Sequence, residues 1–347
     1  MRVSTSTPLP LVLLALLAGC QREPAEGQAP EAPPAATAPA NAPSADAPSP
    51  PSADAHPACP ADAGTAPAGE LVAVRIAAAD GDGTRGLYEG PVWSGDALYF
   101  SDFTFDDGFP SRIRRLTSDG HLETVVDPSG SNGLALGEDG ALVAATHDRK
   151  EISRFDPVDG SRMRIVGEFQ GQPFNSPNDL VIGRDGTIWF TDPDFQRAAA
   201  PGGQDRTRVY RVGAGGEVTV VDDTIANPNG IALAPDGNTL YVAGGGEQGV
   251  LRAYALVDGR PAGQRDLVTD AVVPDGLAVD CLGNIYLTEH NRRRVRVVSP
   301  QGQPLATIAV DANLTNAAFG GPQRRTLFLT GAGSVWSIEL GVAGLPY

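Results

Sequence analysis

One phrase recurs six times in this chain of 347 residues. Each copy begins with a polar residue, most often followed by Gly, and continues with two short apolar runs separated by a turn that contains Gly. The copies begin, 41 to 51 residues apart, at Glu89, Asn132, Asn178, Asn229, Asp275 and Asn316. A repeat of about 40 to 50 residues made of short β-rich runs is typical of propeller blades. The sequence therefore predicts an all-β fold, a six-bladed β-propeller.

The end of the repeat array predicts how the ring closes. The array lacks the sustained 3.6-residue periodicity of a helical solenoid, so strands must build it. The last blade runs out of sequence after its third strand, near residues 335–340, which leaves an unpaired edge. The strand at about residues 71–77 is the one segment not assigned to a blade. We therefore predict that it joins the last blade, and that deletion of residues 70–78 abolishes folding.

The segment before the repeats predicts export and a lipid anchor. Arg2 precedes a leucine-rich run that is too short to span a bilayer and ends in Leu-Ala-Gly-Cys at Cys20. This ending resembles a bacterial lipobox, which implies that Cys20 is lipidated; an ordinary signal peptide is the alternative. Residues 21–69 are almost entirely Pro, Ala, Ser, Gly and acidic residues, which cannot build a core. The predicted organisation is a lipoprotein signal peptide at 1–19, lipidated Cys20 with a disordered linker at 20–69, and the propeller at 70–347.

Charge and cysteine content narrow the partners. A lipid anchor places the chain in the cell envelope on the periplasmic side, and Gln21 after Cys20 resembles sorting signals for the outer membrane. The net charge of -16 argues against nucleic acid as a partner and favours small molecules or cations. We expect a monomer that touches the membrane through its lipid. The other two cysteines, Cys59 and Cys281, have no zinc or iron–sulfur spacing, and export would permit a disulfide that their positions alone do not decide.

The six polar residues that begin the copies hold equivalent positions, so in a propeller they face one central channel. Asn or Asp before Gly also serves turns, and for a single copy that role is the simpler interpretation. Six polar groups converging on one axis would be costly if left unpaired, so the channel should hold water, a cation or both. Carboxylate and amide oxygens form the hard ligand set of Ca²⁺. The sequence predicts Ca²⁺, with Mg²⁺, Mn²⁺ and Zn²⁺ as alternatives.

The phrases Tyr-Glu-Gly-Pro-Val-Trp, Asn-Ser-Pro-Asn-Asp-Leu, Pro-Asn-Gly-Ile-Ala-Leu-Ala-Pro-Asp-Gly, Pro-Asp-Gly-Leu-Ala-Val-Asp and Thr-Asn-Ala-Ala-Phe-Gly-Gly resemble the senescence marker protein, gluconolactonase and luciferin-regenerating enzyme family over about residues 85–332. The resemblance implies a lactone-hydrolysing metal enzyme. It implies that the metal ligands are Glu89, Asn178, Asn229 and Asp275. It also implies that Asp275 acts as the base that accepts the proton of the attacking water.

Several other polar residues are candidates for the site. His147 and His290 follow the second strand of opposite blades; either can be a rim histidine, and similarity to paraoxonase propellers favours His147 as a catalytic proton carrier. Asn132 is expected to bind substrate, and Asn175 and Asp192 either bind substrate at the mouth or serve strand ends. Ser176 stands where animal gluconolactonases carry an Arg, which weakens the prediction of an aldonolactone substrate.

The predicted function is that of a Ca²⁺-dependent lactonase or esterase, a gluconolactonase-like hydrolase acting on a small-molecule lactone or ester. The metal would act as a Lewis acid on the carbonyl group. One alternative is a non-catalytic envelope propeller with a structural metal, and another is a paraoxonase-like hydrolase of aryl esters or phosphotriesters. A Gly-x-Ser-x-Gly elbow is absent from the sequence, so serine hydrolase chemistry has no support.

Overall fold

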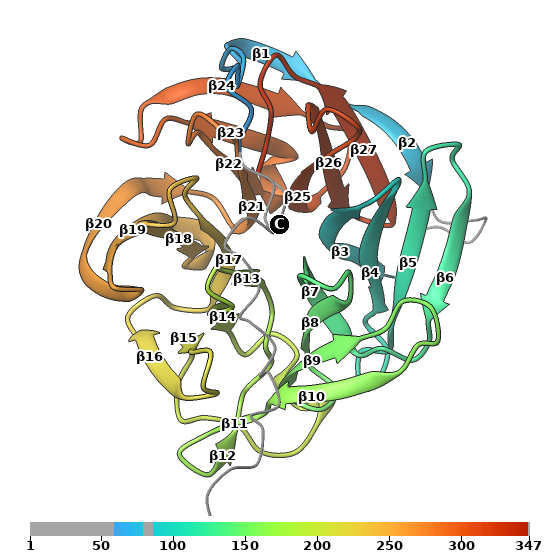
Figure 1. The fold of residues 1–347 in the computed structure, drawn as a ribbon, viewed down its shortest axis with the longest axis vertical. Coiled ribbons are helices and arrows are strands. Elements are labelled where there is room, and N and C mark those ends of the chain that lie inside the picture. Colours follow the sequence, from blue (N-terminus) through green and yellow to red (C-terminus); the bar gives the residue numbers. More distant parts are fainter. Residues whose placement is uncertain (1–58, 79–85, 346–347) are drawn as a thin grey trace, which may run out of the picture. The chain divides into compact units, whose positions relative to one another are not determined.

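The computed structural model describes residues 59–78 and 86–345. Six β-sheets stand around a common centre, and neighbouring innermost strands contact one another in a closed ring from β3 through β25 and back to β3 (Figure 1). The predicted six-bladed propeller is confirmed. Three short 3-10 helices occupy connections between strands, at η1 (Arg197–Ala199), η2 (Gly246–Gln248) and η3 (His290–Arg292). The predicted signal peptide, Cys20 and linker residues 21–58 lie outside the described residues.

Each blade repeats one order of strands from the channel outward. The innermost strands are β3 (Gly86–Ser94), β7 (Ser131–Leu136), β13 (Leu180–Ile182), β17 (Pro228–Leu233), β21 (Pro274–Val279) and β25 (Leu314–Gly320). The second strands are β4 (Ala97–Thr104), β8 (Leu142–Thr146), β14 (Ile188–Asp192), β18 (Thr239–Gly244), β22 (Ile285–Glu289) and β26 (Thr326–Gly331). The third strands are β5 (Ser111–Thr117), β9 (Glu151–Phe155), β15 (Arg208–Val212), β19 (Gly249–Val257), β23 (Arg294–Val298) and β27 (Ser334–Glu339). The outer strands of the first five blades are β6 (Leu122–Val126), β10 (Arg162–Val166), β16 (Val218–Asp222), β20 (Arg260–Ala271) and β24 (Pro304–Ala309). A separate small hairpin joins β11 (Glu168–Phe169) and β12 (Gln172–Pro173).

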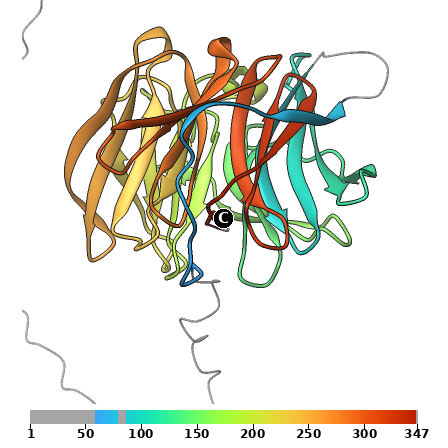
Figure 2. The ribbon, with the colours of Figure 1, turned by 90° about the horizontal axis from the view of Figure 1, so that it is seen from above.

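The N-terminal strand closes the ring, as the sequence predicts, but it is divided between two blades. β2 (Val74–Ala78) pairs antiparallel with β27 and completes the last blade. β1 (Gly69–Val72) pairs in parallel with β24 and adds a fifth strand to the fifth blade. In Figure 2 the blue N-terminal segment runs beside the red strands of the last blade. The division follows from Ala73, which is buried between the two strands and donates its N–H to Ala309.

The ordered domain begins before the predicted boundary at residue 70. Cys59 is joined to Cys281 by a disulfide, so the possibility that the sequence left open is realised in the structure. The backbone of Thr65 then donates to Gly341, and Ala343 donates to Ala63. These bonds hold residues 59–68 against the C-terminal segment, and for that reason they do not behave as a free linker.

The C-terminal segment, residues 340–345, lies across one end of the channel. Leu345 donates its N–H to Val279 at the end of β21, and Gly344 packs so tightly on Phe319 that a Cβ there would overlap the ring. A cavity of about 30 Å³ on the channel axis is lined by residues from all six innermost strands and by Leu345. The C-terminal segment therefore contributes Leu345 to the wall of this cavity.

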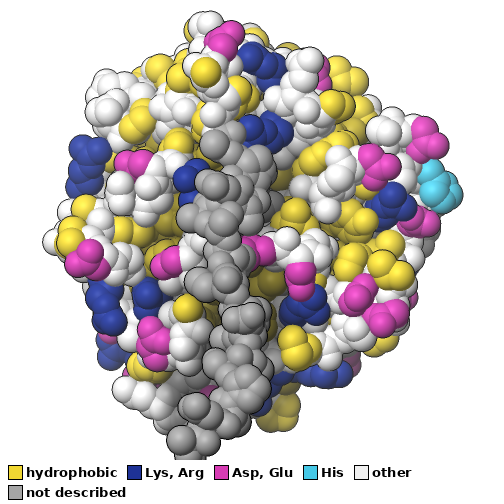
Figure 3. Space-filling model, in the orientation of Figure 1, with side chains coloured by type: hydrophobic (Ala, Val, Ile, Leu, Met, Phe, Trp, Pro, Cys, Tyr) yellow, Lys and Arg dark blue, Asp and Glu magenta, His cyan; other side chains and the backbone are white. Residues whose placement is uncertain are grey.

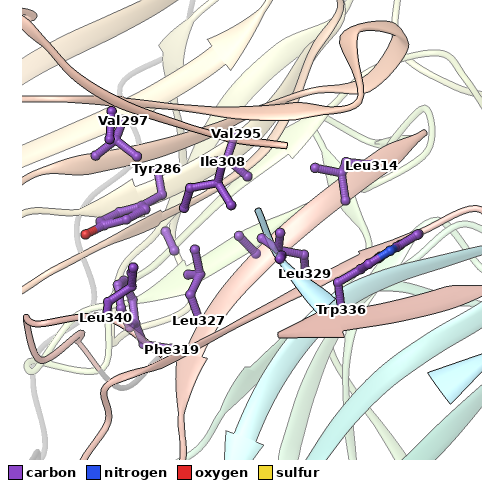
Figure 4. Packing of buried hydrophobic residues seen from close by; sticks show 14 of the residues in the cluster. Tyr286, Val295, Val297, Ile308, Leu314, Phe319, Leu327, Leu329, Trp336 and Leu340 are labelled. Atoms are coloured by element: carbon purple, nitrogen blue, oxygen red, sulfur yellow. The ribbon is translucent and has the colours of Figure 1, made fainter. Parts of the chain in front are cut away.

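Apolar side chains between adjacent blades form the core. Figure 4 shows the cluster between the fifth and sixth blades, where Tyr286 and Phe319 meet edge to face at 5.0 Å between ring centroids. Leu327, Leu329 and Trp336 pack in the same cluster and are almost entirely buried. Each such side chain stabilises the fold by about 1.5–3 kcal/mol relative to exposure. The packing gives the inner strands a rigid frame.

The surface carries charges of both signs. On the face shown in Figure 3, acidic and basic side chains are scattered among apolar ones around the residues drawn in grey. Within residues 59–78 and 86–345, every helix is too short to cross a bilayer.

Candidate metal centre in the propeller channel

Five of the six predicted channel residues are placed by the same feature of the innermost strands. The pairing of β3, β7, β17, β21 and β25 with their neighbours shifts register at the polar residue of each phrase, as at a β-bulge. A bulge adds a residue to one strand and turns its side chain out of the sheet. The polar side chains therefore leave the blades and enter the channel, and all six are at least largely buried, with Asn229 the most accessible.

The glycines after these residues make room for the neighbouring blade. A Cβ on Gly276 would lie 1.9 Å from the side chain of Asn316, and a Cβ on Gly230 would lie 2.4 Å from the carbonyl oxygen of Asp275. Neither glycine has a positive φ, so the turn interpretation does not account for them. Gly is required because adjacent inner strands approach closely at the channel.

Amide side chains connect the carboxylates of the ring. Asn229 donates a hydrogen bond to Asp275. Asn316, for which the sequence assigned no role, donates to Glu89 and also to Asp179 Oδ2 at 3.2 Å. Asp179 was not predicted because it occupies the second position of its phrase, where the other phrases carry Gly or Ala. The channel thus holds three buried carboxyl groups.

These carboxyl groups lack sufficient positive charge nearby. Burial, together with the charges of Asp275 and Asp179, raises the pKa of Glu89 well above its usual value. Burial raises the pKa of Asp179 to about 7. Burial also raises the pKa of Asp275, against the opposing effects of the nearby His290 and of the Asn229 amide. Concentrated negative charge in a desolvated channel is the electrostatic condition under which a divalent cation binds.

The residues present fit a hard divalent cation. In the part of the chain that the structure describes, His, Cys, Asp and Glu form no group of three that could hold a metal by themselves. Amide oxygens must therefore complete the set that Glu89 and Asp275 begin, and Asn178 and Asn229 are in the ring to do so. Asn132 Oδ1 is buried without a hydrogen-bond partner, so a further oxygen acceptor is available. This all-oxygen set suits Ca²⁺.

The two candidate histidines have different surroundings. His290 Nδ1 lies 3.4 Å from Asp275 Oδ2, so the histidine that the sequence ranked lower contacts the central carboxylate. Burial alone would lower the pKa of His290, but the adjacent Asp275 carboxylate outweighs burial and raises the pKa of His290. His147 is fully buried; its Nε2 lies 2.7 Å from the carbonyl oxygen of Phe109, and burial lowers its pKa. His147 is therefore no exposed rim residue, and its catalytic role stays a prediction.

Sequence comparison places most of the propeller in one family. The family described as "SMP-30/Gluconolactonase/LRE-like region" matches residues 87–333. The chain belongs to this family.

Relatives within the SMP-30/gluconolactonase/LRE-like family extend across most of the domain. A gluconolactonase from Zymomonas mobilis is 28% identical over 71% of this chain and 76% of its own length. A lactonohydrolase from Aspergillus oryzae is 28% identical over 74% of this chain and 68% of its own length. The solved structure of a gluconolactonase from Xanthomonas campestris is 30% identical, with a TM-score of 0.67 over 80% of this chain and 99% of that chain.

In this member of the family, Asn175 and Asp192 are engaged with the backbone. Asp192 accepts hydrogen bonds from the N–H groups of Asn175 and Ser176, each at 2.9 Å. Asn175 donates to the carbonyl oxygen of Arg206 and accepts from Gln204. Both residues are fully buried. Burial favours a role at the strand end over substrate binding, the two interpretations that the sequence left open. Substrate contact by either stays a prediction.

A set of hydroxyl groups behind the ring was also missed. Four second strands carry a Ser or Thr beside the inner segment that holds the ring residue, namely Ser101, Thr191, Thr288 and Thr330. Ser101 donates to the carbonyl oxygen of Asn132 at 2.6 Å, and Thr191 donates to that of Asn229 at 2.7 Å. Thr288 donates to Gly276, directly after Asp275, at 2.8 Å. The sequence signal was the recurrence of Ser or Thr near the end of the second apolar run.

Proposed function

We propose that this protein hydrolyses a lactone or related ester at a divalent cation, Ca²⁺ in the first instance, held in the propeller channel by Glu89, Asn178, Asn229 and Asp275. The named activities of both curated relatives and of the solved Xanthomonas structure concern lactones, which supports the reaction class. The observation that carries the metal is the buried ring of carboxyl and amide groups, in which burial raises the pKa values of the Glu89 and Asp275 carboxyl groups.

The chain's own residues account for substrate orientation and proton transfer. When bound, the cation supplies Lewis-acid polarisation of the lactone carbonyl. Asp275 accepts the proton of the attacking water, and His290 at 3.4 Å from its Oδ2 keeps that carboxylate oriented. The amide of Asn132 hydrogen-bonds the substrate, since its Oδ1 is buried without another partner. His147 is the second candidate for the proton acceptor.

The test is a hydrolysis assay of the full mature chain with gluconolactone, an acyl lactone, an aryl ester and a phosphotriester, each with Ca²⁺ and with EDTA. We expect lactone turnover that EDTA abolishes and that Asp275→Ala reduces at least about 100-fold, as loss of a general base does. Asp236→Ala, which removes an exposed turn carboxylate, is the matched control and should leave turnover unchanged.

Each alternative predicts a different result in that assay. Turnover that resists EDTA, or that survives Asp275→Ala, contradicts the metal mechanism. A large thermal stabilisation by Ca²⁺ without turnover of any substrate identifies a binding propeller with a structural metal. Turnover confined to the aryl ester or phosphotriester identifies a hydrolase of the paraoxonase type.

We also propose that the protein is anchored by a lipid on Cys20 in the envelope, with outer-membrane sorting through Gln21. The Cys59–Cys281 disulfide supports export, because such bonds persist in oxidising compartments. In the native host, Cys20→Ser should abolish incorporation of a labelled fatty acid and move the protein from the membrane to the soluble fraction. A wild-type chain that incorporates no label would overturn the anchor.

A further inference from the structure

We propose that the end of β14, Thr191 with Asp192, is the positioning unit that sets the two metal-binding amides Asn178 and Asn229 at their working separation. The inference rests on the proposed metal site. Neither residue was predicted for this role, and neither has to touch the metal or the substrate to perform it.

Thr191 cross-links the two ligand-bearing segments. Its backbone carbonyl accepts from the N–H of Asn178 at 2.9 Å, and its N–H donates to Asp179 at 3.0 Å. Its hydroxyl accepts from the N–H of Asp179 at 3.1 Å and donates to the carbonyl oxygen of Asn229 at 2.7 Å. One side chain therefore connects the third blade to the fourth, directly behind both amides.

Asp192 fixes the chain that leads into Asn178. Both of its carboxylate oxygens lie 2.9 Å from the N–H of Asn175, and one lies 2.9 Å from the N–H of Ser176. Asp192 is fully buried and has a charge partner in Lys150. The ammonium group of Lys150 donates to the carbonyl oxygen of Asn175 at 2.6 Å. Asp192 therefore bonds the N–H of Asn175, and Lys150 bonds its carbonyl group.

The connection after β14 is tied to the same segment. The hydroxyl of Ser176 donates to the carbonyl oxygen of Pro193 at 2.8 Å and accepts from the N–H of Gln196 at 3.3 Å. Lys150 also donates to the carbonyl oxygen of Arg197 at 2.8 Å. These bonds remove the freedom by which Asn178 could move away from Asn229. Groups that orient metal ligands in this way raise metal affinity because the site is formed before the metal arrives.

A matched pair of substitutions isolates this role. Thr191→Val keeps the side-chain shape and removes the hydroxyl between the two ligand segments. Thr146→Val is the control, because the Thr146 hydroxyl is equally buried and also makes one donated and one accepted bond, to Glu151 and from Arg162, away from both amides. Thr191→Ser restores the hydroxyl and tests rescue. Asp192→Asn tests the second half of the unit.

Calorimetric titration of the metal-free full mature chain with Ca²⁺ gives the readout. We expect Thr191→Val to weaken Ca²⁺ binding by about 10-fold or more, the usual effect of losing a group that orients metal ligands. Asp192→Asn should weaken it comparably, whereas Thr146→Val and Thr191→Ser should stay within about threefold of wild type. Lactone turnover of Thr191→Val should recover at high Ca²⁺, with KM for the lactone nearly unchanged.

The outcomes separate this inference from the proposed function. Wild-type affinity in Thr191→Val, or equal losses in Thr191→Val and Thr146→Val, overturns the inference. If Thr191→Val does not fold, wild-type affinity in Asp192→Asn overturns it, and weakened affinity supports it. A wild-type chain that binds Ca²⁺ without hydrolysing any lactone refutes the proposed function alone, because the affinity comparison still decides the positioning role. A wild-type chain that binds no divalent cation overturns both.

Discussion

Asp275 and His290 are two candidate site residues of one blade whose side chains are in contact. Asp275 enters the channel from the innermost strand of the fifth blade, and His290 begins η3 at the end of the second strand of that blade. Their side chains meet at 3.4 Å because the bulge at Asp275 turns its carboxylate toward the strand end. The repeat predicted that His147 and His290 are equivalent, but only packing could show that Phe109 covers His147.

His290→Gln should therefore harm the reaction more than His147→Gln. Loss of the Asp275 contact leaves the carboxylate less well oriented, and we expect kcat to fall about 10-fold or more. The buried His147 should instead show its effect on thermal stability. Steady-state kinetics and thermal melts of both variants check this, and a larger loss of kcat in His147→Gln would favour the paraoxonase-like role for that residue.

Gly276→Ala should disrupt the channel, because a Cβ would lie 1.9 Å from the Asn316 side chain. We expect a loss of about 1–3 kcal/mol in the free energy of unfolding, together with weaker Ca²⁺ binding as Asn316 is displaced from Glu89 and Asp179. Gly263→Ala is the control, since a Cβ there meets no atom within 4 Å, and it should stay within about 0.5 kcal/mol of wild type. Denaturant titration measures both, and equal stabilities would contradict the close-approach explanation.

At the level of elements, the sequence predicted the repeat better than its boundaries. The six phrases mark strand pairs that the structure confirms, because the side-chain period of a strand is visible in sequence. The division of residues 69–78 into β1 and β2 could not be predicted, since it depends on β24 offering an open edge to β1. The ordered course of residues 59–68 depends on the disulfide and on bonds to the C-terminal segment, neither of which composition reveals.

The disulfide should stabilise the closed ring substantially. Cys59 and Cys281 are 222 residues apart, and the loss of chain entropy in the unfolded state over such a loop corresponds to about 5 kcal/mol at most. Cys59→Ser with Cys281→Ser should lower the melting temperature by several degrees, and reductant should do the same to the wild type. Melting curves that superimpose would show that β1, β2 and the C-terminal segment hold the ring without it.

For the molecule as a whole, the excess of acidic groups in the channel links folding to protons and metal. Glu89, Asp179 and Asp275 all have raised pKa values in the folded chain. Between about pH 4 and pH 7 these three groups hold more protons in the folded chain than in the unfolded chain, so their contribution to the free energy of unfolding falls as pH rises through this window. A bound cation takes the place of those protons.

Thermal melts at pH 5 and pH 8 should show this linkage. In EDTA the melting temperature should be lower at pH 8 than at pH 5, and Ca²⁺ should reduce the difference by stabilising the ionised form. Asp179→Asn is the control, because it removes one of the three carboxyl groups, the one whose pKa burial raises to about 7, and should make the profile in EDTA less steep. An unchanged profile in that variant would place the pH dependence elsewhere.

The site could be predicted from sequence to the extent that it follows the repeat. Glu89, Asn132, Asn178, Asn229 and Asp275 were found because they recur at one position in successive blades. Asp179 and Lys150 do not follow that repeat. Their side chains form hydrogen bonds with residues that are distant in sequence. Interactions across blades are set by ring closure, which no local pattern encodes.

Leu345 lines the small cavity on the channel axis together with residues of all six innermost strands. Its N–H is bonded to Val279 of the fifth blade, and Gly344 beside it packs on Phe319 of the sixth blade. Displacement of either inner strand from the axis would therefore break contacts of this segment as well as contacts with the neighbouring blade. The C-terminal residues thereby tie together two blades whose sheets share no strand.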